Sequence, residues 1–201
     1  MREAGQPFRK LLALEFAPYR SLTSSQLDQL EAHNDLLQRW NERLNLTRIR
    51  GTEDVVRLHY CESLFLGTLL PPGNLTIADV GSGGGFPGVP LAVLRPESQL
   101  TLIESHRRKA VFLREASRSL ANVRVECARA EEIQGRFDWA VSRAVSLAGL
   151  QSLNFAANRA FLLSRPDASG LSGEWKLIES PWGKQRVIAL DCSTWNVPRG
   201  T

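Results

Sequence analysis

The chain has 201 residues, enough for one α/β domain with a small appendage and too few for two ordinary domains. Its 43% hydrophobic and 23% charged residues exclude a disordered chain, and no apolar run approaches the ~18 residues of a membrane span. The formal net charge of +4 comes from 21 Arg and 4 Lys against 21 acidic residues, which favours phosphate contacts, although a GC-rich genome gives a similar Arg excess. Met1–Gly5 lacks an apolar signal core, so we expect a cytoplasmic protein.

Residues 1–70 show helical periodicity, and we expect them to form a helical N-terminal extension. Pro7–Phe16 is a short amphipathic segment. Ser24 or Ser25 can cap a second helix that reaches Leu44, and Thr52 can cap a third that reaches Gly67. The Pro-Pro-Gly turn at 71–73 then breaks the pattern, and we take residues 71–201 as a second unit.

After this break, apolar strands alternate with helices. The expected strands are Leu75–Val80, Gln99–Glu104, Val123–Cys127, Asp138–Ser142, Arg159–Leu163, Trp175–Ile178 and Arg186–Leu190. The expected helices are Gly88–Leu94, Arg107–Leu120 and Ala148–Ala157, and residues 181–184 suit a hairpin turn. This alternation predicts an α/β fold with a mainly parallel, doubly wound sheet.

The strongest local signal is a glycine loop, Asp79-Val80-Gly81-Ser82-Gly83-Gly84-Gly85-Phe86-Pro87-Gly88, between the first strand and a helix. Doubly wound folds bind nucleotides at this place. Gly81, Gly83 and Gly85 let the backbone approach a ligand closely. Glu104 ends the next strand, where a carboxylate can accept hydrogen bonds from both ribose hydroxyls.

Two cofactor classes share this arrangement. A dinucleotide fingerprint has a third glycine where this chain has Phe86, followed by Pro87 without an N–H group. A bulky ring there suits S-adenosylmethionine better than NAD, and Asp79 can organise the loop and meet the methionyl amine. A glycine-rich turn that binds nothing is the third alternative.

Three further residues lie at the expected rim of the cofactor site. Ala130 and Glu131 follow the third strand, a position that lies beside the adenine ring of the cofactor in this class of fold. Acidic residues there also suit the first turn of a helix. Arg143 ends the fourth strand, where it lies above the cofactor or pairs with a surface carboxylate. The cysteines, Cys61, Cys127 and Cys192, form no metal or disulfide pattern and are expected to be buried free thiols.

The order of these motifs resembles a known family. The sequences Asn45-Leu46-Thr47, His59-x-x-Glu62-Ser63, the whole glycine loop, Leu102-Ile103-Glu104-Ser105, Ala130-Glu131-Glu132 and Ser142-Arg143-Ala144 are similar to those of bacterial small-subunit ribosomal RNA guanine-N7 methyltransferases, the RsmG (GidB) family. Some positions depart from the family pattern. Leu58 and Glu62 stand where the family has Arg and Asp, Arg57 is one position from the expected Arg, and Ser164-Arg165 replaces a Lys-Gly pair.

The resemblance implies a class I S-adenosylmethionine-dependent methyltransferase fold with a helical extension. It implies that Gly81, Phe86, Ala130, Glu131 and Arg143 contact S-adenosylmethionine, and that Glu104 binds its ribose. Guanine N7 has a free lone pair and no proton, so the protein must mainly position the reactants. We therefore expect no general acid or base and no metal, with Arg143 as an aligning residue.

The basic stretches are expected to face small-subunit ribosomal RNA or the ribosomal subunit, with a monomer as the working assumption. The predicted RNA-binding residues are Arg48, Arg50, Arg107, Arg108, Lys109 and Arg129, although each alone could be solvated surface charge. The alternatives are a small-molecule methyltransferase, an NAD-linked oxidoreductase and a non-catalytic RNA-binding module. An apolar lid, a Tyr-x-x-x-Lys relay and an incomplete cofactor loop would be their respective signatures, and the sequence has none of them.

Overall fold

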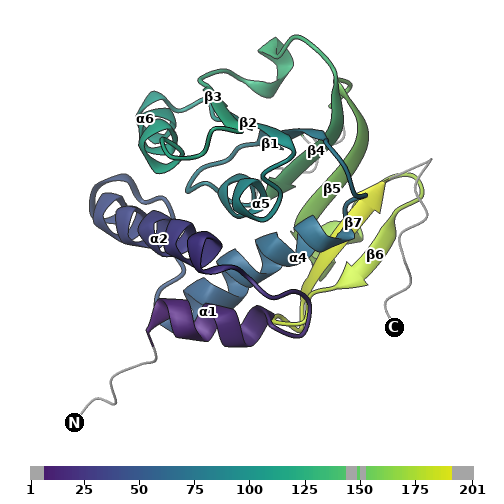
Figure 1. Ribbon diagram of the computed structural model, residues 1–201. Helices are drawn as coiled ribbons and strands as arrows, with labels where there is room; N and C mark the ends of the chain where they lie inside the picture. Colours follow the sequence, from purple (N-terminus) through teal and green to yellow (C-terminus); the bar gives the residue numbers. More distant parts are fainter. Residues whose placement is uncertain (1–6, 144–148, 150–152, 192–201) are drawn as a thin grey trace.

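A computed structural model of the protein describes residues 7–143, 149 and 153–191. Its centre is a seven-stranded sheet with the order β3-β2-β1-β4-β5-β7-β6 (Figure 1). The strands are β1 (Thr76–Val80), β2 (Gln99–Ile103), β3 (Val123–Glu126), β4 (Phe137–Arg143), β5 (Ala156–Ser164), β6 (Lys176–Glu179) and β7 (Arg186–Asp191). The first five are parallel to one another, whereas β7 pairs antiparallel with both β5 and β6. The predicted doubly wound, mainly parallel sheet is confirmed.

The helices that connect the parallel strands are α5 (Gly88–Leu94) after β1 and α6 (Arg107–Ala116) after β2. A 3-10 turn, η2 (Ala130–Glu132), follows β3, and a single helical turn, α8 (Arg165–Ala168), follows β5. The chain builds outward from β1 to β3 on one side and from β4 on the other. The strand order therefore reverses between β1 and β4, and a crevice is expected at the carboxyl ends of these strands.

The N-terminal extension is helical, as predicted. It contains α1 (Phe8–Phe16), α2 (Ser24–Leu44) and a continuous helix made of α3 (Thr52–Asp54), the π-helical η1 (Val55–Cys61) and α4 (Glu62–Leu69). The predicted caps are wrong by one residue. Thr23 caps α2 in a capping box with Gln26, whose backbone N–H lies 3.2 Å from the Thr23 hydroxyl, and Gly51, not Thr52, precedes α3. Thr23 is the cap because Gln26, three residues later, completes the capping box.

The extension and the sheet share one hydrophobic core. Leu12, Leu30 and Leu64 from the extension belong to the same buried cluster as Ile77 from β1 and Trp139 from β4. Figure 1 shows α1, α2 and α4 below the sheet beside α5. The division at residue 70 stays a prediction, but the packing across it is continuous.

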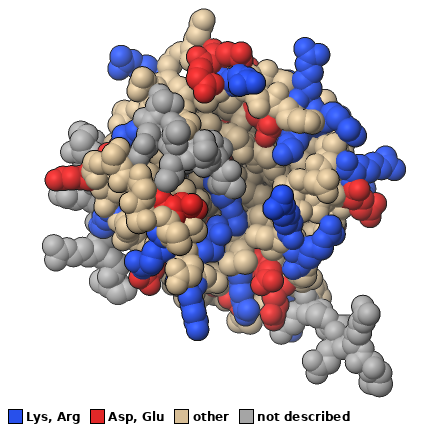
Figure 2. All heavy atoms as spheres, turned by 180° about the vertical axis from the view of Figure 1, so that it is seen from behind, with Lys and Arg blue, Asp and Glu red and all other residues tan. Residues whose placement is uncertain are grey.

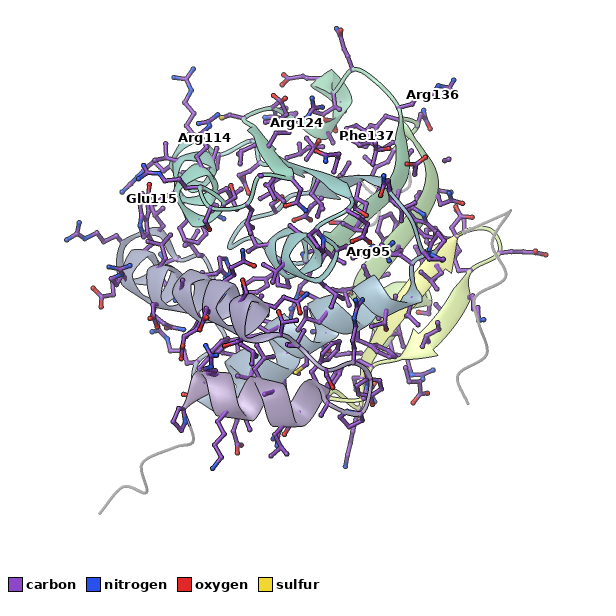
Figure 3. The ribbon with its side chains drawn as sticks, in the orientation of Figure 1. Arg95, Arg114, Glu115, Arg124, Arg136 and Phe137 are labelled. Atoms are coloured by element: carbon purple, nitrogen blue, oxygen red, sulfur yellow. The ribbon has the colours of Figure 1, made fainter. Side chains whose placement is uncertain are left out.

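Arg95 at the end of α5 also ties the two parts together. Its buried guanidinium donates hydrogen bonds to the carbonyl groups of Gly67, Leu70, Pro71 and Gly73 at the end of α4 and the turn that follows. Figure 3 labels Arg95 in the view of Figure 1. These carbonyls would otherwise lack partners at a helix end. The Pro-Pro-Gly break is thus held in place from inside the sheet unit.

Two predictions fail in the second unit. The helix expected over 148–157 is wrong from residue 153 onward, since β5 begins at Ala156, which pairs with Phe137 of β4; residues 144–148 and 150–152 lie outside the described part. Sheet pairing overrides the helical preference of alanine there. Cys127 is exposed, not buried, because β3 ends one residue before it; Cys61 is buried, and Cys192 lies outside the described residues. In the described part, no helix has the length and apolar character to cross a membrane.

Candidate functional site

An open cleft of about 750 Å³ lies at the carboxyl ends of β1, β2, β4 and β5, where the strand order reverses. Its walls come from the glycine loop, the segment between α2 and α3, η1 and β5. The predicted site residues that line it are Gly81, Gly83, Phe86, Glu104, Arg143, Arg48 and Lys109. Residues as far apart in the chain as Arg48 and Arg143 thus meet at one site.

The glycine loop is held by Glu104. One oxygen of its carboxylate accepts a hydrogen bond from the Gly83 N–H at 3.0 Å, and the other accepts one from the His106 N–H at 2.8 Å. Gly81, Gly83 and Gly85 have positive φ angles of 71°, 52° and 88°, which suit glycine. Glu104 therefore shapes the loop and at the same time presents its carboxylate to the cleft.

Asp79 lies beneath the loop and is fully buried. Its Oδ2 accepts a hydrogen bond from the Gly88 N–H at 2.9 Å, which connects β1 to the start of α5. Burial raises the pKa of Asp79 to about 7, against the lowering effect of the Ser82 hydroxyl and the Gly88 N–H. Its Oδ1 has no hydrogen-bond partner among the described residues, so this buried oxygen can still accept a donor.

The other face of the loop rests on the helical extension. The His33 Nε2–H donates to the Gly84 carbonyl at 3.1 Å, and its Nδ1 accepts from the Tyr60 hydroxyl at 2.7 Å. A Cβ at Gly85 would lie 2.8 Å from the His33 ring, so Gly85 allows α2 to approach and does not line the cleft. Burial lowers the pKa of His33 to about 4, and the ring is neutral.

His59 of η1 supports Phe86. The two rings stack with their centroids 4.3 Å apart, and His59 Nε2 lies 2.7 Å from the Thr47 hydroxyl. Burial, together with nearby Arg143 and Arg186, lowers the pKa of His59 well below its ordinary value. The family motifs quoted above include His59 and Thr47, but the analysis of the sequence gave neither residue a role.

Arg143 is one of two arginines that pair with the buried carboxylate of Glu62. The Glu62 side chain has no exposed surface, accepts from Arg186 Nε at 2.6 Å and lies 3.6 Å from Arg143 Nη2. Arg143 also donates to the Leu58 carbonyl, and burial lowers its pKa to about 10, so it stays charged near neutral pH. Arg186 enters the cleft from β7 and was not predicted, because no nearby motif marks it.

The remaining predicted residues lie outside the lining of this cleft. Ala130 and Glu131 form the η2 turn, and Arg50, Arg107 and Arg129 are exposed. Arg108 lines a second groove between α2 and α6. Arg57, one position from the expected family arginine, pairs with Glu15 of α1 at 2.7 Å. Among the described residues, no three His, Cys, Asp or Glu side chains gather as a metal site.

The sequence matches known relatives. The family model of rRNA small subunit methyltransferase G (GidB) matches residues 26–196. The chain is 44% identical over 124 residues to ribosomal RNA small subunit methyltransferase G of Dichelobacter nodosus, covering 60% of this chain and 58% of the relative. It is 46% identical over 122 residues to the protein of that name from Neisseria gonorrhoeae, covering 58% of each. The chain thus spans 58% of the length of these relatives.

Solved structures share the fold. A ribosomal protein L11 methylase from Lactobacillus delbrueckii subsp. bulgaricus has a TM-score of 0.54 at 12% identity, covering 65% of this chain and 77% of that one. A SAM-dependent methyltransferase from Aquifex aeolicus has a TM-score of 0.52 at 18% identity, covering 68% and 92%. At these identities the likeness is one of fold, the Rossmann-like class I methyltransferase fold predicted from the sequence. Because the family model covers most of the sequence, the chain belongs to the rRNA small subunit methyltransferase G family.

Proposed function

We propose that this protein transfers a methyl group from S-adenosylmethionine to N7 of a guanine in small-subunit ribosomal RNA. Family membership supports the reaction class, and the observation that carries the proposal is the cleft itself. In one place it combines a glycine loop, a strand-end carboxylate and a buried arginine.

The residues fit S-adenosylmethionine in three respects. Glu104 presents a carboxylate for the two ribose hydroxyls, and Gly81 and Gly83 leave the loop backbone open to close approach. The unpartnered Oδ1 of Asp79 lies beneath the loop and is suited to a cationic amine. We assign Phe86 to the wall of the site, and Gly85 to the loop turn. Ala130 and Glu131 are assigned to the adenine end. When bound, S-adenosylmethionine supplies an activated methyl group on its sulfonium.

The protein has little chemistry of its own to perform. Guanine N7 carries no proton, so no base is needed, and alignment of the reactants contributes up to ~7–11 kcal/mol. Arg143 is held in the wall of the cleft by Glu62 and the Leu58 carbonyl, and we assign it to alignment of the guanine. Both groups keep its guanidinium in one orientation.

The cations around the cleft support an RNA substrate. In the part of the chain that the structure describes, none of Arg48, Arg50, Arg107, Arg108, Lys109 and Arg129 forms an ion pair. Arg48 and Lys109 lie in the lining itself. Unpaired cations at an open cleft suit the phosphate backbone of an RNA better than a small neutral substrate, which disfavours the small-molecule alternative.

The test is methylation of small-subunit RNA, as free transcript and as 30S subunit, with labelled S-adenosylmethionine. N7-methylguanosine is cationic, and borohydride followed by aniline converts it to a strand break. We expect one new break at a guanine. Methyl incorporation without a break would exclude N7, and no incorporation into either RNA form would overturn the proposal.

An Arg143→Lys variant tests the assigned alignment. Lysine keeps the charge but cannot reproduce the planar fork of the guanidinium. We expect slower single-turnover transfer with RNA affinity within about twofold of the original protein. An unchanged single-turnover rate would remove Arg143 from the reacting centre.

A further inference from the structure

A second groove, of about 540 Å³, lies between the C-terminal half of α2 and the first turns of α6. Its volume falls in the ~300–1,000 Å³ range of small-ligand pockets. Its lining includes Trp40, Val111, Arg39, Arg43 and Arg108. None of the residues that line the groove lines the cleft described above.

The floor of this groove is apolar. Trp40 is half-buried and packs against Phe112, with ring centroids 5.8 Å apart. Val111 on α6 is 51% exposed, which is unusual for a large apolar side chain in this protein. Among the described residues, the Trp40 indole N–H has no hydrogen-bond partner.

The edges of the groove are cationic. Nine arginines elsewhere in the described structure form ion pairs, but Arg39, Arg43 and Arg108 form none there. Arg39 has only a 3.3 Å hydrogen bond to the Asp35 carbonyl, and Glu42 is the single acidic residue in the lining. Figure 2 shows lysine and arginine side chains gathered on the right of that view, the side of α2 and α6.

The groove and the cleft are neighbours. Arg108 lines the groove and the next residue, Lys109, lines the cleft, so the first turn of α6 separates the two. Consecutive Cα atoms are ~3.8 Å apart, and one polynucleotide backbone can cross this turn from one site to the other. The exposed Arg107 lies on the same turn.

We propose that this groove holds an unpaired nucleotide of the RNA substrate, adjacent along the strand to the guanine in the cleft. The base stacks on Trp40 against Val111, and Arg39, Arg43 and Arg108 contact the neighbouring phosphates. Proteins read single-stranded RNA in this way, with aromatic faces for bases and arginines for the backbone. The proposal rests on the proposed function for the identity of the RNA, and it names the contact that fixes the strand beside the cleft.

The first experiment compares two substitutions with the same charge change. Val111→Glu puts a carboxylate in the groove, and Leu14→Glu puts one on α1, where Leu14 is 63% exposed. Affinity for a small-subunit RNA transcript is measured by filter binding at one salt concentration, with thermal unfolding as a folding control. We expect Val111→Glu to bind about tenfold more weakly and Leu14→Glu within about twofold of the original protein. Equal affinities of the two variants would overturn the proposal.

The second experiment separates base stacking from charge. Fragments of the transcript that contain the methylated guanine carry one abasic nucleotide at each flanking position in turn. We expect the original protein to lose about tenfold in affinity at one position, the value of one stacked base. Trp40→Leu should bind the intact fragment about tenfold more weakly and show no further loss at that position. The proposal would be overturned if no position is sensitive, or if the losses of affinity from Trp40→Leu and from the abasic position add. If Trp40→Leu does not fold, the same abasic positions are compared in Val111→Ala.

The two proposals fail separately. If the original protein transfers no methyl group to small-subunit RNA, the proposed function is wrong. The groove proposal is then tested by the affinity of the same variants for an oligouridylate of about 20 nucleotides. If methyl transfer occurs and Val111→Glu binds and reacts like Leu14→Glu, only the groove proposal is wrong. Polyglutamate is the remaining competitor: displacement of RNA by polyglutamate but not by oligouridylate would assign the groove to an acidic peptide and overturn the RNA assignment.

Discussion

Glu104 shows how one side chain serves both the loop and the cleft. Both of its carboxylate oxygens accept backbone N–H groups, from Gly83 and His106, and the same carboxylate lines the cleft. Glu104→Ala should weaken S-adenosylmethionine binding by about tenfold or more, since a hydrogen bond to a charged acceptor contributes ~1.5–3 kcal/mol. Isothermal titration calorimetry measures this affinity.

Asp138→Ala is the matched control for that prediction. Asp138 also accepts a backbone N–H, from Thr76 at 2.7 Å, but at the opposite, amino-terminal edge of the sheet. Its loss should lower stability and leave the cofactor affinity unchanged. Equal effects of the two variants on affinity would mean that Glu104 acts only through stability.

His33 makes folding stability depend on pH. Burial lowers its pKa from 6.5 to about 4, so between these values the unfolded chain binds a proton that the folded chain does not. The contribution of His33 is therefore full above pH 6.5 and declines as the pH falls toward 4, by about 1.4 kcal/mol per pH unit. The raised pKa of Asp79, about 7, acts in the opposite direction, and the lowered pKa of His59 acts in the same direction, so the whole protein alone cannot isolate the effect of His33.

The measurement compares urea unfolding of the original protein and His33→Asn at pH 7 and pH 5. Subtraction removes the parts due to Asp79 and His59, which both proteins contain. The free energy of unfolding of the original protein minus that of His33→Asn should decrease by about 2 kcal/mol between pH 6.5 and pH 5. A difference independent of pH would show that the pKa of His33 is not lowered in the folded protein.

At the scale of elements, Glu62 joins the long helix of the extension to the β6–β7 hairpin. It accepts hydrogen bonds from Ser180 at 2.9 Å and from Arg186, and it pairs with Arg143. Glu62→Ala would leave two arginines without their buried partner, and such losses cost ~3–5 kcal/mol. Urea unfolding should show a decrease of this size.

Glu53→Ala provides the comparison within the same continuous helix. Glu53 pairs with Arg57 at 3.5 Å, but its side chain is 70% exposed. An exposed pair of this kind contributes about 0–1 kcal/mol. Similar losses in the two variants would contradict a special role for the buried carboxylate.

The elements that the sequence predicts well are those with local signals. The apolar strand before Gly81 and the loop geometry follow from adjacent residues. Glu104 is placed because it directly follows the apolar strand β2. The start of β5 was missed, because Ala156 becomes strand only through its pairing with Phe137. His33 and Arg186 were missed for the same reason: their partners, Gly84 and Glu62, are far away in the chain. Nothing in the local sequence indicates such contacts.

At the scale of the whole molecule, the surface arginines fall into two classes, those with an acidic partner and those without one. Arg118 and Arg124 each lie near an acidic partner, whereas Arg107 and Arg108 have none among the described residues. Composition alone gives only the Arg excess and does not separate these two classes. The structure therefore sharpens the predicted RNA-facing set, which stays a prediction until binding is measured.

The salt dependence of RNA affinity tests this division. Replacement of both Arg107 and Arg108 by alanine should reduce the slope of log affinity against log salt by about one unit per lost phosphate contact. Arg118→Ala with Arg124→Ala removes the same charge from ion-paired positions and should leave the slope nearly unchanged. Equal slopes for the two double variants would mean that Arg107 and Arg108 are ordinary surface charge.

The shared core makes a prediction about the whole fold. Leu12, Leu37 and Leu64 of the extension are fully buried in the cluster that also holds Leu91 of α5. A fragment of residues 71–201 would expose the apolar surface that these side chains cover, and a patch of that kind favours association over folding. We therefore expect the 201-residue chain to unfold in a single transition, with far-ultraviolet circular dichroism and tryptophan fluorescence coinciding. The fragment should bind a hydrophobic dye and show no cooperative transition. A fragment that unfolds cooperatively near the midpoint of the full chain would establish the two units as independent, and the contacts of His33 and Arg95 would then be additions to a complete fold.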